Sequence, residues 1–224
     1  MVYIPPLFLL YEENYGQVEF FTVDLDYVHY LKAAELAHRG FTRVPNMEYG
    51  EAKKQKFLCG VVLTVNELDY YVPVTSYKEK KPDNFLIEAD NGVVTSSLRF
   101  NYMFPVPKIL VSERIISEEP DRAYRALLSQ ELRYCIKNQD TILRLAERTY
   151  KRVLLGKDPG LVKNSCSFVF LEEKCKEYMV HLERLLTRKP SLDSQMSAAR
   201  CKSSEENRNC SKCISSSKNV SDGR

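Results

Sequence analysis

A long, apolar, β-branched segment followed by a turn and a second apolar segment constrains this chain more than any other feature. Residues 57–65 (Phe-Leu-Cys-Gly-Val-Val-Leu-Thr-Val) are typical of a buried strand, and residues 70–74 (Tyr-Tyr-Val-Pro-Val) of its returning partner. The sequence Glu67-Leu-Asp69 between them predicts a turn. The chain therefore contains a β-hairpin, and its fold must include an antiparallel sheet.

Shorter apolar segments predict further strands on both sides of this hairpin. They lie at residues 18–23, 85–89, 93–94 and 103–106, and a turn signal is present at Asp90-Asn-Gly92. The polar residues 45–56 predict a loop. The first half of the chain therefore supplies the sheet.

The second half of the chain has helical periodicity. Apolar residues at helical spacing predict helices over residues 121–137, 140–155 and 168–186, and Asp24 can cap an earlier helix that ends near Gly40. Strands followed by helices predict an α+β fold, in which helices pack against a twisted, mostly antiparallel sheet.

Composition sets the limits of the folded part. The chain has 224 residues, of which 44% are hydrophobic and 28% charged, as in globular proteins. No apolar run approaches the ~20 residues that a membrane span needs, and the first residues are a poor signal peptide. We expect a domain over residues 18–188 and a disordered polar tail over residues 189–224. For the N-terminal extension over residues 1–17 the sequence leaves two interpretations open, a genuine N-terminal strand or a protein whose true first residue is Val18.

Charge and cysteines describe the environment of this domain. Residues 186–224 carry eight basic and four acidic side chains, which leaves 25 basic and 26 acidic side chains in the rest of the chain. Any binding of a polyanion by the domain must therefore come from local patches. Cys59, Cys135, Cys166 and Cys175 lie in apolar surroundings and are expected to be buried, reduced thiols of a cytosolic protein.

A Thr-Ser-x-Lys sequence directly after the hairpin is the first candidate for chemistry. Thr75 and Ser76 supply hydroxyls and Lys78 supplies an ammonium within four residues. In an extended segment Ser76 and Lys78 point to the same face, where they can bind a phosphate and offset developing negative charge. An ordinary solvated strand end has the same residue types, and the sequence leaves both interpretations open.

The predicted helix over residues 140–155 is the second candidate. It places Arg144, Arg148, Lys151 and Arg152 opposite its apolar stripe, with Glu147 as the one acidic residue among them. Such a face can bind a polyanion, although a solvated face has the same pattern. A further basic cluster, Lys53, Lys54 and Lys56, lies in the predicted loop.

Tyrosines beside these cations form a third, weaker pattern. Tyr49 precedes Lys53 and Lys54, and Tyr77 neighbours Lys78. Aromatic rings beside cations suit stacking on unpaired bases, whereas half-buried packing is the plainer interpretation. Metal binding is not expected, because the tail offers only Cys201, Cys210 and Cys213, fewer than the four ligands of a structural zinc site. We expect no cofactor.

Several short sequences also occur in a fixed order between residues 18 and 181. They are Phe20-Phe-Thr-Val23, Val44-Pro45-Asn46, Phe57-x-x-Gly60-Val-Val-Leu63, Tyr71-Val-Pro-Val-Thr-Ser-Tyr-Lys78, Met103-Phe-Pro-Val106 and Cys166-x-Phe168-x-x-Leu171-Glu172. In this order they resemble the ToxN/AbiQ family, the toxin endoribonucleases of type III toxin–antitoxin systems. The Pro-x-Thr-Ser-x-Lys and Cys-x-Phe-x-x-Leu-Glu sequences are the more specific parts.

The resemblance implies a fold, an activity and partners. The fold would have a strongly twisted antiparallel sheet related to that of MazF/Kid toxins, partly surrounded by helices. The activity would be metal-independent cleavage of single-stranded RNA by 2′-OH attack, leaving a 2′,3′-cyclic phosphate. The implied inhibitor is a small folded RNA made from tandem repeats, bound in a hetero-oligomeric protein–RNA assembly. The substrates would be cellular or phage RNA in the bacterial cytoplasm, as phage defence requires, with no membrane or DNA partner.

The resemblance also assigns residues. Thr75, Ser76 and Lys78 fall on the active-site motif of the family, and Tyr27 falls on its active-site tyrosine in the first helix. Tyr49 matches a second tyrosine, and Lys53 or Lys54 a basic loop residue, in a loop whose length differs here. Tyr77 stands where relatives often have proline.

Two other classes of function fit the same residues. In the first, the Thr-Ser-x-Lys sequence only grips phosphate, and the protein is a non-catalytic RNA-binding module. In the second, Ser76 is the nucleophile of a Ser–Lys hydrolase of peptides or esters.

Overall fold

The computed structural model describes residues 16–50 and 54–188. Of these described residues, those up to Tyr178 form one unit and those from Met179 onward belong to another. The expectations for residues 1–15, for Lys53 and for the tail over 189–224 with its three cysteines lie outside the described residues.

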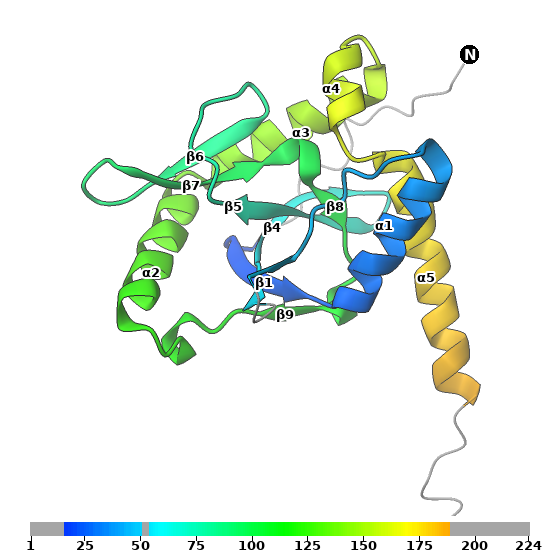
Figure 1. Cartoon of the computed structure of the whole chain (residues 1–224), viewed down its shortest axis with the longest axis horizontal. Coiled ribbons are helices and arrows are strands. Elements are labelled where there is room, and N and C mark those ends of the chain that lie inside the picture. Colours follow the sequence, from blue (N-terminus) through cyan, green and yellow to red (C-terminus); the bar gives the residue numbers. More distant parts are fainter. Residues whose placement is uncertain (1–15, 51–53, 189–224) are drawn as a thin grey trace, which may run out of the picture. The chain divides into compact units, whose positions relative to one another are not determined.

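An antiparallel sheet forms the centre of the first unit (Figure 1). Its strand order is β6-β7-β5-β4-β1-β9, and β8 pairs with β5. The strands are β1 (Glu19–Val23), β4 (Leu58–Val65), β5 (Leu68–Thr75), β6 (Asn84–Glu88), β7 (Val94–Arg99), β8 (Phe104–Pro105) and β9 (Val111–Glu113). Every described pair is antiparallel.

The predicted hairpin is confirmed as β4 and β5. Its tight turn is Asn66-Glu67, with φ of 52° and 65°, the left-handed conformation that a two-residue hairpin turn requires. Next to the turn, Val65 lies opposite Leu68. Farther along, Leu58 lies opposite Pro73, after a shift in register between Cys59 and Leu63.

The segment expected as a loop contains a small ribbon. Strands β2 (Glu48–Tyr49) and β3 (Lys54–Gln55) pair antiparallel, with Tyr49 opposite Lys54. Two-residue strands are too short to show alternation of apolar and polar side chains, so the sequence pattern could not predict them.

Five helices are described, and α2 lies on the side of β6 and β7 while α1 lies at the other side of the sheet (Figure 1). They are α1 (Leu25–Arg39), α2 (Arg122–Lys137), α3 (Gln139–Leu155), α4 (Pro159–Asn164) and α5 (Phe168–Arg188). Asp24 caps α1 as expected, and Gly40 ends it with φ of 76°. Helix α3 begins at Gln139, separated from the end of α2 by one residue, and Asp140 lies in its first turn.

The α+β prediction is confirmed, and so is the burial of the four cysteines of the domain, all of which are free thiols. The sequence Cys166-x-Phe168-x-x-Leu171-Glu172 is buried in the core. The Glu172 carboxylate accepts hydrogen bonds of 2.7 Å from the hydroxyls of both Tyr70 and Tyr150. This motif therefore ties α5 to β5 and α3 and has a structural role. Within residues 16–50 and 54–188, no helix is both long and apolar enough to cross a membrane.

Candidate active site

The end of β5 holds Ser76 in a fixed place. Thr75 lies opposite Ser97 of β7, and their hydroxyl oxygens are 3.3 Å apart. The Ser97 hydroxyl also donates a hydrogen bond of 2.5 Å to the carbonyl of Tyr77. The buried Ser97 therefore fixes the backbone on both sides of Ser76, whose own side chain is exposed.

A hollow of about 280 Å³ opens beside Thr75 and Ser76. Its walls come from β5, β7, α2 and the β2–β3 segment. The lining residues are Tyr49, Lys56, Phe57, Val74, Thr75, Ser76, Thr95, Ser96, Tyr124, Leu127 and Glu131. The structure thus brings together three of the predicted site residues, Tyr49, Thr75 and Ser76. Tyr49 is 44% exposed and its ring can be reached by a ligand.

Lys56 is the cation within this hollow. The sequence showed it only as one member of a basic loop cluster. In the structure it is half-buried, and its Nζ donates a hydrogen bond of 2.9 Å to the carbonyl of Asn46. Its backbone N–H donates to the carbonyl of Met47 at 2.8 Å. Both bonds hold Lys56 beside Thr75.

A second hollow of about 280 Å³ meets the first at Lys56 and Thr75, which line both. Its other lining residues are Thr42, Arg43, Val44, Pro45, Asn46, Pro73 and Tyr102. Tyr102 also lines a third hollow, of about 330 Å³, together with Lys81, Arg99 and Arg152. The three hollows therefore share residues in series and form a track with a cation in each.

A buried carboxylate shapes the second hollow. Glu35 of α1 is 0% exposed, and it accepts hydrogen bonds from the Thr42 hydroxyl at 2.7 Å and the Arg43 N–H at 2.6 Å. It also accepts one from the N–H of Ser167 at 2.7 Å. These bonds fix the loop after α1, which leads to Asn46 and so to the position of Lys56.

Tyr124 of α2 lines the first hollow, and its hydroxyl is protonated at neutral pH. Burial raises the pKa of Tyr124 above its ordinary value, with the carboxylates of Glu131 and Glu119 adding to the shift and Arg114 opposing it. The Tyr124 hydroxyl therefore stays protonated at neutral pH and is available as a donor.

Lys78 lies outside the hollow that Ser76 lines. Its side chain is exposed, and it is not among the lining residues of any of the three hollows. β5 ends at Thr75, so the expected extended segment from Ser76 to Lys78 does not continue the strand. Lys78 is therefore close to Ser76 in sequence, and its exposed side chain does not line the hollow.

The structure contradicts the expected contact between Tyr27 and RNA. Tyr27 is 0% exposed, and its hydroxyl donates a hydrogen bond of 2.7 Å to the carbonyl of Pro105. Burial, foremost, raises its pKa well above the ordinary value. A ring with no exposed surface cannot stack on a base, so Tyr49 is the tyrosine of the site and Tyr27 belongs to the core.

The predicted basic face of α3 is largely paired. Lys151 forms an ion pair with Glu147, and Arg152 forms one of 2.8 Å with Asp158 beyond the helix end. Arg148 donates to the carbonyl of Pro82, and Arg144 to that of Asp140 in its own helix. Asp158, six residues beyond Arg152, is an acidic partner outside the helix in addition to Glu147, so Arg144 and Arg148 are the two of the four cations without an ion pair among the described residues.

Tyr77 and Lys54, also predicted to contact RNA, take part in contacts within the protein. The guanidinium of Arg99 lies 4.9 Å from the centre of the Tyr77 ring and 4.3 Å from that of Tyr102. The Tyr77 hydroxyl donates to Glu79 at 2.7 Å. Lys54 belongs to β3, where its backbone pairs with Tyr49.

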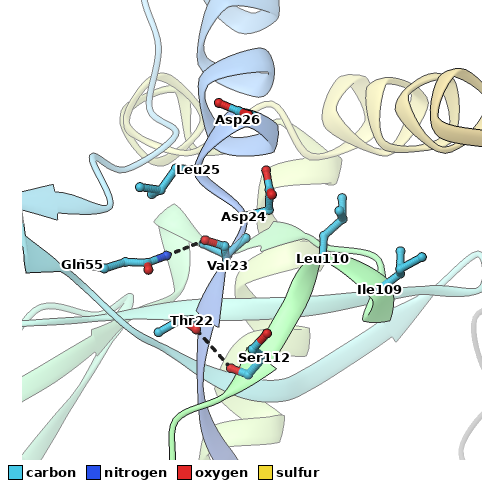
Figure 2. A pocket seen from close by; sticks show the side chains of 9 residues that line it. All are labelled: Thr22, Val23, Asp24, Leu25, Asp26, Gln55, Ile109, Leu110 and Ser112. Carbon is cyan, nitrogen blue, oxygen red and sulfur yellow. Dashed lines mark hydrogen bonds between the residues drawn. The ribbon is translucent and has the colours of Figure 1, made fainter. Parts of the chain in front are cut away.

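A further hollow, of about 440 Å³, lies at the start of α1 (Figure 2). Its described lining includes the carboxylates of Asp24 and Asp26 and no cation, which disfavours a phosphate. Gln55 reaches into it and donates a hydrogen bond of 2.5 Å to the carbonyl of Val23 (Figure 2). Gln55 thereby anchors β3 to β1, and the next residue, Lys56, lines the candidate site.

The sequence of this chain is similar to those of known bacterial toxins. Residues 19–176 match the model of the toxin ToxN of type III toxin–antitoxin systems. An endoribonuclease ToxN of Pectobacterium atrosepticum is 28% identical over 171 residues, which are 72% of this chain and 94% of that protein. An endoribonuclease ToxN of Bacillus thuringiensis subsp. kurstaki is 29% identical over 176 residues, 74% of this chain and 86% of its own. An endoribonuclease AbiQ of Lactococcus lactis subsp. lactis is 27% identical over 176 residues, 72% of this chain and 89% of its own.

Solved structures agree with these sequence matches. One comes from a study of selective toxin inhibition by a non-coding RNA pseudoknot in bacterial type III toxin–antitoxin systems. It superposes with a TM-score of 0.64 at 27% sequence identity, and the match covers 73% of this chain and 99% of that chain. Another is the structure of AbiQ, described as a lactococcal anti-phage endoribonuclease of a type III toxin–antitoxin system. It has a TM-score of 0.62 at 23% sequence identity, and the match covers 73% of this chain and 99% of that chain. This likeness supports the fold alone.

Proposed function

Because this chain belongs to the ToxN family of type III toxin–antitoxin toxins, we propose that it is an endoribonuclease that cleaves single-stranded RNA at the junction of the first two hollows. The observation that carries the proposal is the meeting of Thr75, Ser76, Tyr49 and Lys56 around one open hollow. Its substrates are cellular or phage transcripts in the bacterial cytoplasm.

The nucleophile in this reaction comes from the substrate. The ribose 2′-OH attacks the adjacent phosphorus in line, the bond to the 5′-oxygen breaks, and a 2′,3′-cyclic phosphate remains. The protein must orient the strand, move two protons and stabilise the negative charge of the transition state. No activated water is required for this first step.

Each side chain has a role that its position allows. Thr75 and Ser76 hydrogen-bond the phosphate oxygens, and Lys56 stabilises their charge from within the junction. Lys78 adds a second cation from the open side and can protonate the leaving oxygen. The exposed ring of Tyr49 stacks on a base beside the cleaved bond.

The family also suggests the regulation of the site. Relatives include a toxin studied as inhibited by a non-coding RNA pseudoknot. We propose that a small folded RNA inhibits this chain as well, by laying an unpaired segment through the same hollows. Its folded part would contact basic surface outside them, for which Arg144 and Arg148 of α3 are candidates.

A single incubation separates this proposal from its alternatives. End-labelled single-stranded RNA is mixed with the full chain in excess EDTA, and the products are mapped and tested for cyclic phosphate. Cleavage with cyclic-phosphate ends supports the proposal. RNA that is bound but left intact would indicate a non-catalytic RNA-binding module, and labelling of Ser76 by a serine-directed probe would indicate a Ser–Lys hydrolase.

A further inference from the structure

A nearly buried carboxyl group without a hydrogen bond lines the first hollow. Glu131 of α2 is 3% exposed, its side chain forms no hydrogen bond or ion pair within residues 16–50 and 54–188, and it interacts electrostatically with the Tyr124 hydroxyl and the Cys135 thiol. Ser96 of β7 lines the same hollow. It is 6% exposed, and its hydroxyl has no hydrogen-bond partner in the described part of the chain.

Two such groups in one hollow require an explanation. A buried polar group that lacks a hydrogen bond destabilises the folded state, and a buried carboxylate does so more strongly. Most buried polar groups are paired for this reason, and each exception needs an explanation, such as a functional role or a bound water or ion. The hollow gives both groups access to a ligand.

The remaining walls indicate what shape the ligand has. Phe57, Val74 and Leu127 supply apolar surface, and Tyr124 supplies a ring. A mostly apolar hollow with a few polar groups is typical of a site for a flat, partly polar molecule. The adjacent Thr75 and Ser76 are the groups proposed to hold the phosphate, so a nucleobase of the same RNA strand fits this description.

We infer that Glu131 and Ser96 recognise one nucleobase beside the cleaved bond, and that this base carries an exocyclic amine. This inference rests on the proposed function and names its substrate preference. A carboxylate only accepts hydrogen bonds, so it pairs with the amine of adenine, cytosine or guanine. Guanine offers a second donor, its ring N–H, beside the amine. Uracil presents carbonyl oxygens on both sides of its single N–H, and these oxygens face the carboxylate unfavourably.

The test uses four oligoribonucleotides that differ only at the base beside one mapped cleavage bond. We expect wild-type kcat/KM for adenine, cytosine or guanine to exceed that for uracil at least tenfold. In Glu131→Gln the side chain both donates and accepts, so the ratio should fall at least fivefold, through faster cleavage of the uracil substrate. Glu118→Gln, which changes an exposed carboxylate outside the hollow, should keep the wild-type ratio.

Two results would overturn the inference. One is an unchanged base preference in Glu131→Gln. The other is a decrease of kcat/KM by at least a hundredfold, equal for all four substrates, in a variant whose pH–rate profile no longer falls on the acid side. That result would make Glu131 a general base. The variant should unfold at the same temperature as wild type or higher, because within the described part of the chain Glu131 makes no hydrogen bond that the change would break; a lower midpoint would show that Glu131 has a structural role instead.

A binding measurement keeps this inference separate from the proposed activity. Short 2′-O-methyl oligonucleotides lack the attacking hydroxyl and can be compared as all-adenine, all-cytosine and all-uracil versions by fluorescence anisotropy. Wild type should bind the first two at least threefold more tightly than the third, and Glu131→Gln should equalise them. If RNA is not cleaved but this pattern holds, the proposed activity alone fails. Equal wild-type affinities would refute the base-recognition site.

Discussion

Lys56 lines the hollow beside Thr75 and Ser76, and Lys78 is the exposed cation two residues after Ser76. Lys56 is held by the carbonyl of Asn46 and is half-buried. Lys78 is exposed, so it can follow the phosphate as the strand binds. A cation that is free to move and one that is fixed can together balance the charge that develops on the phosphate oxygens.

Replacing Lys78 tests the mobile cation. Lys78→Ala should lower the rate of RNA cleavage about 100-fold or more, the usual effect of removing one group that stabilises transition-state charge. Its thermal midpoint should be unchanged, since an exposed side chain is lost. Lys80→Ala is the matched control, because Lys80 is also exposed but donates to the carbonyl of Asn84 at 3.2 Å. Equal rates for the two variants would exclude Lys78 from the reaction.

The two tyrosines assigned to the site should behave in opposite ways. Tyr49→Ala should slow cleavage tenfold or more, since base stacking contributes about 1–3 kcal/mol, and should leave stability unchanged. Tyr27→Phe removes the hydrogen bond to Pro105 and should destabilise the fold by about 1 kcal/mol with cleavage retained. Urea unfolding and a cleavage assay on both variants decide the matter, and the reverse outcome would restore Tyr27 to the active site.

At the scale of whole elements, the contact between α5, α3 and the β4–β5 hairpin depends on one carboxylate. Glu172 accepts from Tyr70, Tyr150 and the side-chain amide of Asn66. Glu172→Gln keeps Oε1 for the two tyrosine hydroxyls but places an amide donor where Oε2 accepts from Asn66, and should lower the free energy of unfolding by about 1 kcal/mol because the Asn66 amide loses its acceptor. The neighbouring Glu173 is exposed, so Glu173→Gln in the same urea titration should match wild type. Equal unfolding of the two variants would mean that the network does not stabilise the fold.

Local patterns in the sequence were sufficient to predict most of these elements but not the site. The β4–β5 hairpin follows from composition, yet counting from its turn places Leu58 opposite Thr75. The register shift between Cys59 and Leu63 places Leu58 opposite Pro73 instead. The same shift brings Lys56 beside Thr75. Such a shift depends on tertiary packing, and at Gly60 an added Cβ would lie 2.3 Å from the Tyr71 ring.

For two further residues, Tyr27 and Glu131, the structure shows a position that was not predicted from the sequence. The helical pattern of α1 could not decide whether Tyr27 faces the core or solvent. In α2, by contrast, a usable signal was present, because Glu131 shares the buried stripe of Leu128 and Cys135 at helical spacing. An acidic residue on such a stripe indicates a polar site inside the fold.

At the scale of the whole molecule, buried tyrosines predict loss of stability in alkali. Burial, foremost, raises the pKa of Tyr71 to about 12, and it also raises the pKa values of Tyr27, Tyr70 and Tyr150. Below pH 10 these groups are protonated in both states. Above it the unfolded chain loses their protons first, so stability falls as pH rises towards 12.

Tyr71→Phe measures one part of this effect. A tyrosine with a raised pKa contributes about −1.4 kcal/mol per pH unit to the slope of the unfolding free energy against pH, in the range between its pKa in the unfolded chain and its pKa in the folded protein. The slope of unfolding free energy against pH should therefore be shallower by about 1.4 kcal/mol per unit in the variant, between pH 10 and 12. Urea titrations in that range give the slopes, and identical slopes would contradict the assignment.

The central claim is that RNA is cleaved where the two hollows meet at Lys56 and Thr75. The measurement is the single-turnover rate of RNA cleavage in EDTA by the full chain and by Lys56→Ala. Arg133→Gln serves as control, because it removes one positive charge from an exposed site paired with Asp90. We predict cleavage by wild type and the control at equal rates, and a rate at least about 100-fold lower for Lys56→Ala at unchanged thermal midpoint. A folded Lys56→Ala protein that cleaves as fast as wild type would place the active site elsewhere.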